Sequence, residues 1–343
     1  MTSVHTEAAT SEALVSLLRR TPGYRDQIVH IEAIPPRPAR YADPAAPLPD
    51  ALRAALVARG IARLYAHQAA ALDAARSGAH LGVVTGTASG KTLCYQLATL
   101  EALLADPSGR ALFLFPTKAL AHDQLRSLEG LLAALTAEDR PTTAATLDGD
   151  TPMSVRDGVR ASAQIILSNP DMLHRSLLPD HRRWAGWLAR LRYVVLDEAH
   201  TYRGVFGTHV ALIVRRMRRL CAYYGSAPQF ICCSATSANP DAHLAALVGA
   251  PVTVIADDGA PQGRRTFVFW NPPVIEDRGS RMDDRASNLV PRSSSEGGRR
   301  RSTNVETAHL LAALVRANVK TFTCHPIHTC PTDRSTRHRS CLT

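Results

Sequence analysis

Short runs of apolar and β-branched residues recur along this sequence, separated by stretches of helical length that are rich in alanine, leucine and arginine. An apolar run of about four to eight residues is typical of a buried strand. We expect strands at 81–85, 111–115, 164–168, 193–196, 229–233, 252–255 and 266–270, with helices between them, for example at 93–104, 119–135 and 208–224. Strands that alternate with helices indicate an α/β fold, with a mostly parallel sheet and helices on both faces.

Both ends of the chain depart from this alternation. Residues 11–20 predict a short helix, and the proline-rich stretch 35–49 predicts an extended segment. The polar, arginine-rich stretch 276–303 predicts a linker, after which a helix pattern and a strand pattern resume at 304–322. Residues 323–343 show no periodicity and are too polar to fill a core.

The composition fits a soluble protein of about two domains. The chain has 343 residues, of which 45% are hydrophobic and 20% charged, and its mean hydropathy is −0.10. No uninterrupted apolar run exceeds the six residues 310–315, whereas a membrane helix needs about 20. The start of the sequence has acidic residues and no apolar segment of the secretory type. We therefore expect a cytoplasmic protein that does not contact a membrane.

Most of the formal charge of +10 comes from one end of the chain. From residue 278 onward there are 12 basic and five acidic residues, so the preceding part is only mildly basic. Nucleic-acid binding by that part would depend on local groups rather than on a general positive field. Only three of the 40 basic residues are lysines, at positions 91, 118 and 320. A genome biased towards arginine is one explanation; against that background a retained lysine can mark a site where a compact ammonium is needed, and two of the three lie in the motifs below. The seven cysteines form no C-x-x-C pair, so no zinc framework is visible.

A glycine-containing loop follows the first of these strands and runs directly into a helix pattern. It reads Thr85, Gly86, Thr87, Ala88, Ser89, Gly90, Lys91 and Thr92. The N–H groups of such a loop bind the phosphates of ATP, Lys91 reaches the β and γ phosphates, and the Thr92 hydroxyl ligates Mg²⁺. The strict pattern begins with glycine, and this chain has Thr85 there. A chance glycine-rich turn, the alternative, does not account for strand, loop and helix in that order.

A later apolar strand ends in two adjacent carboxylates, Asp197 and Glu198, which follow Lys91 by 106 and 107 residues. Neighbouring residues of a strand point to opposite sides, so the two acids cannot share one role. We assign Asp197 to Mg²⁺ and Glu198 to polarising the attacking water, as phosphoryl transfer to water requires. Taken alone, acids at a strand end more often form an exposed turn or a helix cap. The phosphate-binding loop upstream favours the catalytic interpretation.

Other side chains would complete a nucleotide site. Ser234 and Thr236 follow the strand 229–233, where their hydroxyls could bond His200 and relay the state of the nucleotide, although such hydroxyls usually only cap a turn. Gln68 lies upstream of the loop, and its amide both donates and accepts, so it matches the edge of adenine. A solvated helix residue is the alternative for Gln68.

Two segments at strand ends are candidates for binding nucleic acid. They are Pro116, Thr117 and Lys118 after the strand 111–115, and Asn169, Pro170 and Asp171 after the strand 164–168. Each segment opens a helix, whose N–H groups can hold the backbone phosphates of a single strand without reading bases. Ordinary strand-to-helix turns are the alternative, and the rarity of lysine favours a phosphate contact at Lys118.

Together these elements resemble the first RecA-like domain of superfamily 2 nucleic-acid helicases of the DEAD/DEAH-box class. In chain order they match the adenine-reading motif, motifs I, Ia and Ib, a DEAH form of motif II at 197–200, and motif III. Segments 27–30, 64–68, 148–152 and 197–204 resemble the MrfA-type helicases, a RecQ-like family with a cysteine-rich C-terminal domain, and their fungal relatives.

The resemblance implies a RecA-like P-loop NTPase fold that uses ATP and Mg²⁺ and acts on single-stranded nucleic acid, in this family DNA. It implies catalytic roles for Lys91, Glu198 and His200, and a role in DNA repair. It covers about residues 20–322 and stops after the first strand of a second RecA-like domain, so we expect a truncated gene product. That second domain would supply arginine fingers, and the sequence leaves open whether another chain provides it.

We divide the chain into five segments on this basis. They are an N-terminal extension (1–50), a first RecA-like ATP-binding domain (51–275), a linker (276–303), the start of a second RecA-like domain (304–322) and a tail outside the family (323–343). A metal site is the alternative for the tail, formed by Cys324, His325, His328, Cys330, His338 and Cys341. Their spacing matches no zinc pattern.

Two functions of different classes follow from the sequence. The first is an ATP-dependent DNA helicase of the DEAH type. The second is a fragment that binds ATP and nucleic acid but hardly hydrolyses ATP, because an arginine finger contributes about 10³ to 10⁵ in rate. A small-molecule kinase or transporter ATPase is disfavoured by the segments 197–200 and 234–236.

Overall fold

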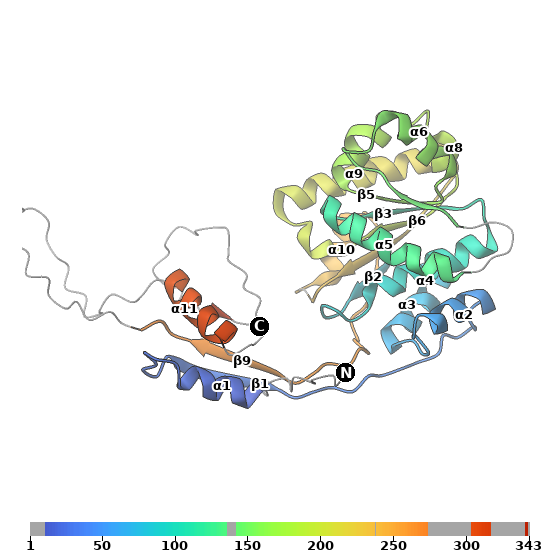
Figure 1. Ribbon diagram of the computed structural model, residues 1–343. Coiled ribbons are helices and arrows are strands. Elements are labelled where there is room, and N and C mark those ends of the chain that lie inside the picture. The colour runs from blue at the N-terminus through green and yellow to red at the C-terminus, as the bar shows by residue number, and fades with distance from the viewer. Residues whose placement is uncertain (1–10, 136–141, 237, 274–302, 317–339, 342–343) are drawn as a thin grey trace, which may run out of the picture. The chain divides into compact units, whose positions relative to one another are not determined.

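The computed structural model describes residues 11–135, 142–236, 238–273, 303–316 and 340–341 (Figure 1). The chain divides into two compact units. The larger unit is Pro38–Pro261, and the smaller one joins Met1–Arg37 to Gln262–Thr343. The predicted linker and tail lie largely outside the described residues, so the five-segment division of the chain stays a prediction.

A sheet flanked by helices forms the centre of the larger unit (Figure 1). It has seven strands in the order β4-β5-β3-β6-β7-β2-β8. Every neighbouring pair runs parallel, which confirms the predicted α/β fold. The strand β4 has only three residues, too short an apolar run to predict from the sequence. The strands are β2 (Leu81–Val84), β3 (Arg110–Leu114), β4 (Ala144–Thr146), β5 (Ile165–Ser168), β6 (Leu191–Leu196), β7 (Gln229–Ser234) and β8 (Thr253–Ile255).

Helices cover both faces of this sheet, as predicted. Along β3, Leu112 and Leu114 belong to one buried cluster, and Ala111 and Phe113 belong to another. Helices α6, α8, α9 and α10 pack into the first cluster, and α2, α3, α4 and α5 pack into the second. Burial on both sides accounts for the uninterrupted apolar runs of the strands. The helices are α2 (Asp50–Ala58), α3 (Ala66–Arg76), α4 (Lys91–Ala105), α5 (Lys118–Ala134), α6 (Met153–Ser162), α7 (Pro170–Met172), α8 (Ala185–Leu188), α9 (Gly204–Tyr223) and α10 (Pro240–Val248).

The smaller unit contains an antiparallel sheet in the order β1-β9-β10. Its elements are α1 (Ser11–Arg19), β1 (Ile28–Ile34), β9 (Arg265–Trp270), α11 (Thr303–Arg316) and β10 (Ser340–Cys341). Its buried core comprises Leu18, Val268, Trp270, Leu310 and Leu314.

This second sheet corrects two predictions. Residues 266–270 do not join the parallel sheet, and the N-terminal stretch contributes a strand of its own, β1. The apolar pattern of β9 identifies it as a strand but does not specify its partner, which lies far earlier in the chain. Among the described residues of both units, no helix has the length and apolar character needed to cross a bilayer.

Candidate functional site

The loop between β2 and α4 is held in shape by its own buried side chains. Thr85 and Ser89 are 1% and 2% exposed, and their hydroxyl oxygens are hydrogen-bonded at 2.7 Å. Gly90 precedes α4 with a φ of +83°, a left-handed conformation that glycine adopts without strain. Lys91 Nζ donates to the carbonyl oxygens of Thr85 at 3.0 Å and Gly86 at 2.6 Å. The ammonium therefore lies within the loop, at the start of a helix whose dipole favours an anion.

The middle of this loop is open to solvent. Thr87 and Ala88 are exposed, and Ala88 has a φ of +58°. A left-handed non-glycine residue costs roughly 1–2 kcal/mol, a cost that is common at ligand-binding loops. Thr92 is half-buried in the first turn of α4. The residues predicted to bind phosphate thus form one continuous loop and helix start.

Asp197 directly follows β6, at the edge of the sheet where the loop after β2 also lies. Its N–H donates to the Leu114 carbonyl at 3.0 Å, and the residue is only 7% exposed. Asp197 Oδ2 accepts from the Tyr95 hydroxyl at 3.2 Å, and Oδ1 accepts from the Glu198 N–H at 2.8 Å. Burial raises the pKa of Asp197 to about 6, an effect that the Glu198 N–H opposes. The helix that begins at Lys91 therefore touches the first acid directly.

Tyr95 is a site residue that the sequence analysis missed. It is fully buried, and its ring packs edge-on against Phe113 with centroids 5.0 Å apart. Its hydroxyl also lies 3.4 Å from Gln124 Oε1. The available signal was its place three residues after Thr92, because helix residues at that spacing share a face.

Glu198 lies outside the strand, which corrects the argument from strand alternation. The strand β6 ends at Leu196, and Glu198 has a left-handed backbone with φ 49° and ψ 42°. This turn, rather than the pleat of a strand, separates the two carboxylates. Glu198 Oε2 lies 3.2 Å from His200 Nδ1, and the two side chains are 37% and 34% exposed. Water can therefore reach this second acid.

His200 connects the ends of β6 and β7 through a backbone group. Its Nδ1 accepts from the Ala235 N–H at 3.3 Å, whereas the Ser234 hydroxyl donates to the Ala235 carbonyl at 2.9 Å and Thr236 is exposed. The predicted contact between the two motifs exists, but without the predicted hydroxyl bond from Ser234, because that side chain is buried at the end of β7. One nitrogen cannot accept from Ala235 and donate to Glu198 at once, so the tautomer of the His200 ring decides which of these two partners Nδ1 bonds.

Gln68 is buried near the start of α3, which excludes the alternative of a solvated residue. Its Oε1 accepts from the Tyr65 N–H at 2.9 Å, and its Nε2 donates to the Gly90 carbonyl at 3.1 Å. The same residues line a cavity of about 530 Å³. In it, the rings of Tyr41 and Tyr65 stack with centroids 5.4 Å apart, and the Arg63 guanidinium lies 4.8 Å from the centre of the Tyr41 ring. A flat base fits beside such rings, and the sequence analysis did not identify the two tyrosines.

The two segments predicted to bind nucleic acid begin helices at the ends of neighbouring parallel strands, β3 and β5. Thr117 caps α5 by accepting from the Leu120 N–H at 3.3 Å. Asn169 caps α7 by accepting from the Met172 N–H at 2.8 Å. At α5 the cap leaves the N–H groups of Lys118 and Ala119 in the first turn for an anion. At α7 it leaves only the N–H of Asp171, because Pro170 has none.

The remaining residues of these two segments differ in what they offer a phosphate. Pro170 is buried and Pro116 is half-buried, and neither has an N–H. Asp171 is exposed and carries a negative charge that repels phosphate. Lys118 is exposed, and its ammonium donates to Asp150 at 2.8 Å. Lys118 is therefore the side chain of these segments whose positive charge would attract the phosphates of a nucleic-acid strand.

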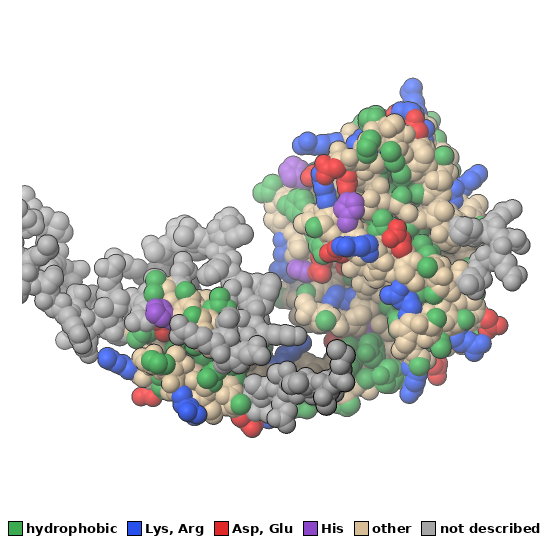
Figure 2. Space-filling model, in the orientation of Figure 1, with side chains coloured by type: hydrophobic (Ala, Val, Ile, Leu, Met, Phe, Trp, Pro, Cys, Tyr) green, Lys and Arg blue, Asp and Glu red, His purple; other side chains and the backbone are tan. Residues whose placement is uncertain are grey.

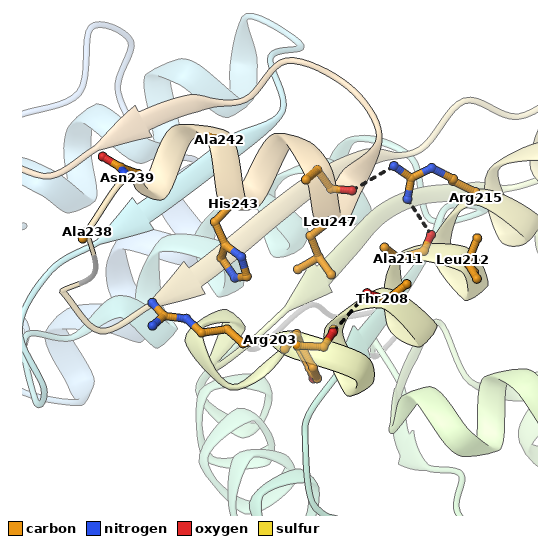
Figure 3. Close-up of a pocket in the computed structure, with 14 residues that line it drawn as sticks. Arg203, Thr208, Ala211, Leu212, Arg215, Ala238, Asn239, Ala242, His243 and Leu247 are labelled. Carbon is orange, nitrogen blue, oxygen red and sulfur yellow. Dashed lines mark hydrogen bonds between the residues drawn. The ribbon is translucent and has the colours of Figure 1, made fainter. Parts of the chain in front are cut away.

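A groove of about 650 Å³ is lined by residues of α9 and α10, which pack against each other (Figure 3). Arg203 and His243 point into it, and Arg215 donates to one carbonyl of each helix at 3.0 Å (Figure 3). His243 Nε2 also lies 3.0 Å from the Ala199 carbonyl. The groove is thus connected to the turn that carries the acids, a link that the sequence did not reveal.

Charged side chains of both signs are interspersed over the described part of the larger unit's face shown in Figure 2, together with histidines. This distribution agrees with the mild charge of that part of the sequence. Binding of a nucleic-acid strand to this face would depend on backbone N–H groups at helix starts and on individual cationic side chains.

Comparisons with known proteins agree with this geometry. Residues 65–243 match the model of the DEAD/DEAH box helicase family. The chain is 45% identical over 250 residues to the uncharacterized ATP-dependent helicase YprA of Bacillus subtilis (strain 168). It is 41% identical over 271 residues to the ATP-dependent helicase HRQ1 of Saccharomyces cerevisiae (strain ATCC 204508 / S288c). These matches cover 73% and 78% of this chain but only 33% and 25% of the relatives.

Solved structures give the same result. The crystal structure of the DUF1998 helicase MrfA bound to DNA is similar over 90% of this chain and 40% of that one, with a TM-score of 0.77 and 40% identity. MrfA bound to DNA and AMPPNP matches with the same TM-score and 39% identity. The family match spans more than half of the chain and includes both the phosphate-binding loop and the acid pair. The chain therefore belongs to the DEAD/DEAH box helicase family.

Proposed function

We propose that this chain is the ATP-binding part of a motor that moves along a single strand of DNA. One observation carries the proposal: Tyr95, on the helix that begins at Lys91, donates to Asp197 at 3.2 Å. The phosphate-binding loop and the acid pair therefore share one site, where a triphosphate on the loop would bring its outer phosphates towards the acids. The names of the relatives, ATP-dependent helicases, support ATP as the nucleotide.

The donors at this site suit Mg²⁺. This ion prefers oxygen ligands and usually takes only one or two from the protein. Asp197 is a nearly buried carboxylate whose pKa burial raises to about 6, so a cation beside it would stabilise the charged form. The Thr92 hydroxyl at the start of α4 is the other proposed ligand. When bound, Mg²⁺ neutralises charge that develops on the phosphate oxygens.

Lys91, Glu198 and His200 carry the remaining chemistry in this proposal. The Lys91 ammonium donates to two loop carbonyls and can turn to phosphate oxygens in their place. The accessible Glu198 carboxylate accepts a hydrogen bond from water and orients it for in-line attack. His200 lies beside both Glu198 and Ala235, so its position can link hydrolysis to the end of β7.

The starts of α5 and α7, together with Lys118, form the proposed strand-binding edge. Backbone N–H groups and an ammonium hold phosphates and not bases, so binding there would not depend on base sequence. MrfA has been solved with DNA, which supports DNA for this chain. A cytoplasmic location, a role in DNA repair and a second RecA-like domain supplied to the motor are further parts of this proposal.

The test measures binding of a fluorescent ATP analogue and the rate of ATP hydrolysis by the full chain, with and without single-stranded DNA. We expect Mg²⁺-dependent binding that Lys91→Ala weakens by about tenfold or more, because a charge-assisted bond to phosphate is lost. Absence of nucleotide binding by the wild-type chain would refute the proposal. Stimulation of hydrolysis by DNA supports the motor, whereas binding of both ligands without stimulation supports the alternative of a binding fragment.

A further inference from the structure

The cation of the strand-binding edge is already paired within the protein. Lys118 Nζ donates to Asp150 Oδ2 at 2.8 Å. The two side chains are 46% and 81% exposed, so a phosphate can reach the same ammonium. An ammonium has three donors but a single charge. A carboxylate and a phosphate at Lys118 therefore compete for that charge.

A turn clamped by two helices holds Asp150 in place. The buried Asp148 accepts through Oδ1 from the N–H groups of Asp150 at 2.9 Å and Thr151 at 3.0 Å. Its Oδ2 lies 3.0 Å from His122 Nε2 on α5. Arg156 of α6 donates to the Thr151 carbonyl at 3.0 Å. The position of Asp150 is thus built into the fold, although its carboxylate is exposed.

The same turn lies on the strand-binding edge. It follows β4, which pairs in parallel with β5, so it shares the edge from which α5 and α7 begin. A Cβ added to Gly149 would lie 3.5 Å from Lys118 Nζ, an ordinary contact. The lysine side chain therefore crosses the turn to reach Asp150.

We propose that Asp150 is an internal competitor for the strand phosphate at Lys118 and so limits the affinity of this edge for single-stranded DNA. The inference rests on the proposed function, since Lys118 must contact the strand. An exposed ion pair is weak, so a phosphate displaces the carboxylate readily and the effect on affinity is about two- to fivefold. A motor that must release each phosphate as it advances gains from such a weakened contact.

A double-mutant cycle tests this competition. Fluorescence anisotropy measures binding of the full chain to a fluorescein-labelled oligothymidine for the wild-type, Asp150→Asn, Lys118→Gln and doubly substituted chains. We expect Asp150→Asn to bind about two to five times more tightly and Lys118→Gln to bind more weakly. Asp150→Asn should have little effect in the Lys118→Gln background, because the competitor acts through Lys118.

Asp123→Asn is the matched control. Asp123 is 59% exposed on α5 and pairs with Arg126, so its loss changes the net charge equally without touching Lys118. An equal gain from Asp123→Asn, or a gain that persists in the Lys118→Gln background, would show a net-charge effect and overturn the inference. Unchanged or weaker binding by Asp150→Asn would also overturn it. If Lys118→Gln leaves binding intact, the strand contact at Lys118 fails too, whereas ATP binding through Lys91 would still stand.

Discussion

The Gln68 amide nitrogen donates to the Gly90 carbonyl at 3.1 Å and so connects the start of α3 to the phosphate-binding loop. The other end of the amide accepts from the Tyr65 N–H. A base beside Gln68 would therefore contact a residue that is hydrogen-bonded to the loop on which the phosphates would lie. A Cβ at position 90 would lie 2.6 Å from Gln68 Nε2, so a larger residue there would displace this amide from its two hydrogen bonds.

Gly90→Ala should therefore destabilise the protein in two ways. The left-handed φ of +83° costs a side chain roughly 1–2 kcal/mol, and the contact with Gln68 adds strain of similar size. We expect the free energy of unfolding to fall by about 2–4 kcal/mol and ATP binding to weaken strongly. Urea unfolding and titration with a fluorescent ATP analogue measure the two effects.

Gly78→Ala separates the two causes. Gly78 has nearly the same φ, +82°, but an added Cβ would meet nothing within 4 Å. Gly78→Ala should lower the free energy of unfolding only by the cost of the left-handed backbone, roughly 1–2 kcal/mol. In a chain that carries both Gln68→Ala and Gly90→Ala, the part of the stability loss that the contact with Gln68 causes should disappear. Equal losses from the two glycine substitutions would show that the approach of Gln68 is unimportant.

Tyr95→Phe should weaken nucleotide binding in a way that depends on Mg²⁺. The substitution keeps the ring against Phe113 but removes the hydroxyl that donates to Asp197. We expect a loss of about 1–2 kcal/mol in stability and a higher Mg²⁺ requirement, because the carboxylate loses a donor that positions it. Binding of the ATP analogue, titrated against Mg²⁺, provides the readout.

Tyr193→Phe controls for the loss of a hydroxyl alone. Tyr193 lies on β6, and no hydrogen bond of its hydroxyl is found among the described residues. This substitution should leave the Mg²⁺ requirement unchanged. If both variants shift it equally, the bond between Tyr95 and Asp197 has no special role.

The sequence predicted the parallel sheet and the phosphate-binding loop because both depend on local patterns. The segment 111–115, which includes most of β3, is apolar without interruption because the strand is buried on both faces, and this can be read from five consecutive residues. The loop motif is eight adjacent residues, 85–92, that lead from a strand into the first turn of a helix. In both cases the physical cause lies within the segment itself.

Contacts between distant segments were not predictable in this way. Tyr95 and Asp197 are hydrogen-bonded although they lie 102 positions apart in the sequence, and Lys118 and Asp150 although they lie 32 positions apart. Such contacts depend on strand order, which an apolar pattern does not encode. The left-handed turn at Glu198 was missed for another reason, since a single backbone conformation leaves no periodic signal in the sequence.

Trp270→Phe should loosen the smaller unit. The Trp270 indole N–H donates to the buried Glu306 carboxylate at 3.0 Å, which joins β9 to α11. A hydrogen bond to a charged group is worth about 1.5–3 kcal/mol. We expect faster hydrogen exchange at the backbone amides of β1 and α11.

Trp187→Phe is the matching change in the larger unit. The Trp187 indole N–H donates to the neutral Ala163 carbonyl at 3.1 Å. This variant should lose less unfolding free energy, about 0.5–1.5 kcal/mol. It should leave hydrogen exchange at the backbone amides of β1 unchanged. Equal acceleration of β1 exchange by both tryptophan variants would contradict the role given to Glu306.

Asp197 should make the stability of the nucleotide-free protein depend on pH. Burial raises its pKa from 3.8 to about 6, so the folded protein keeps a proton over a range in which the unfolded chain has lost it. In that range the free energy of unfolding falls as pH rises. At 1.36 kcal/mol per pKa unit, the charged and buried carboxylate costs about 3 kcal/mol at pH 7 and only about 0.5 kcal/mol at pH 4.

Asp197→Asn should remove this dependence, because the amide stays neutral at every pH. Relative to the wild-type chain, the variant should gain about 2–3 kcal/mol of unfolding free energy between pH 4 and pH 7 when nucleotide and Mg²⁺ are absent. With ATP and Mg²⁺ the order should reverse at pH 7, since bound ligand stabilises the folded state and the carboxylate binds the ion better than the amide does. Urea unfolding across this pH range checks both expected changes, the gain in unfolding free energy without ligand and the loss at pH 7 with ATP and Mg²⁺. A variant that loses stability relative to the wild-type chain as pH rises without ligand would show that the pKa of Asp197 is not raised.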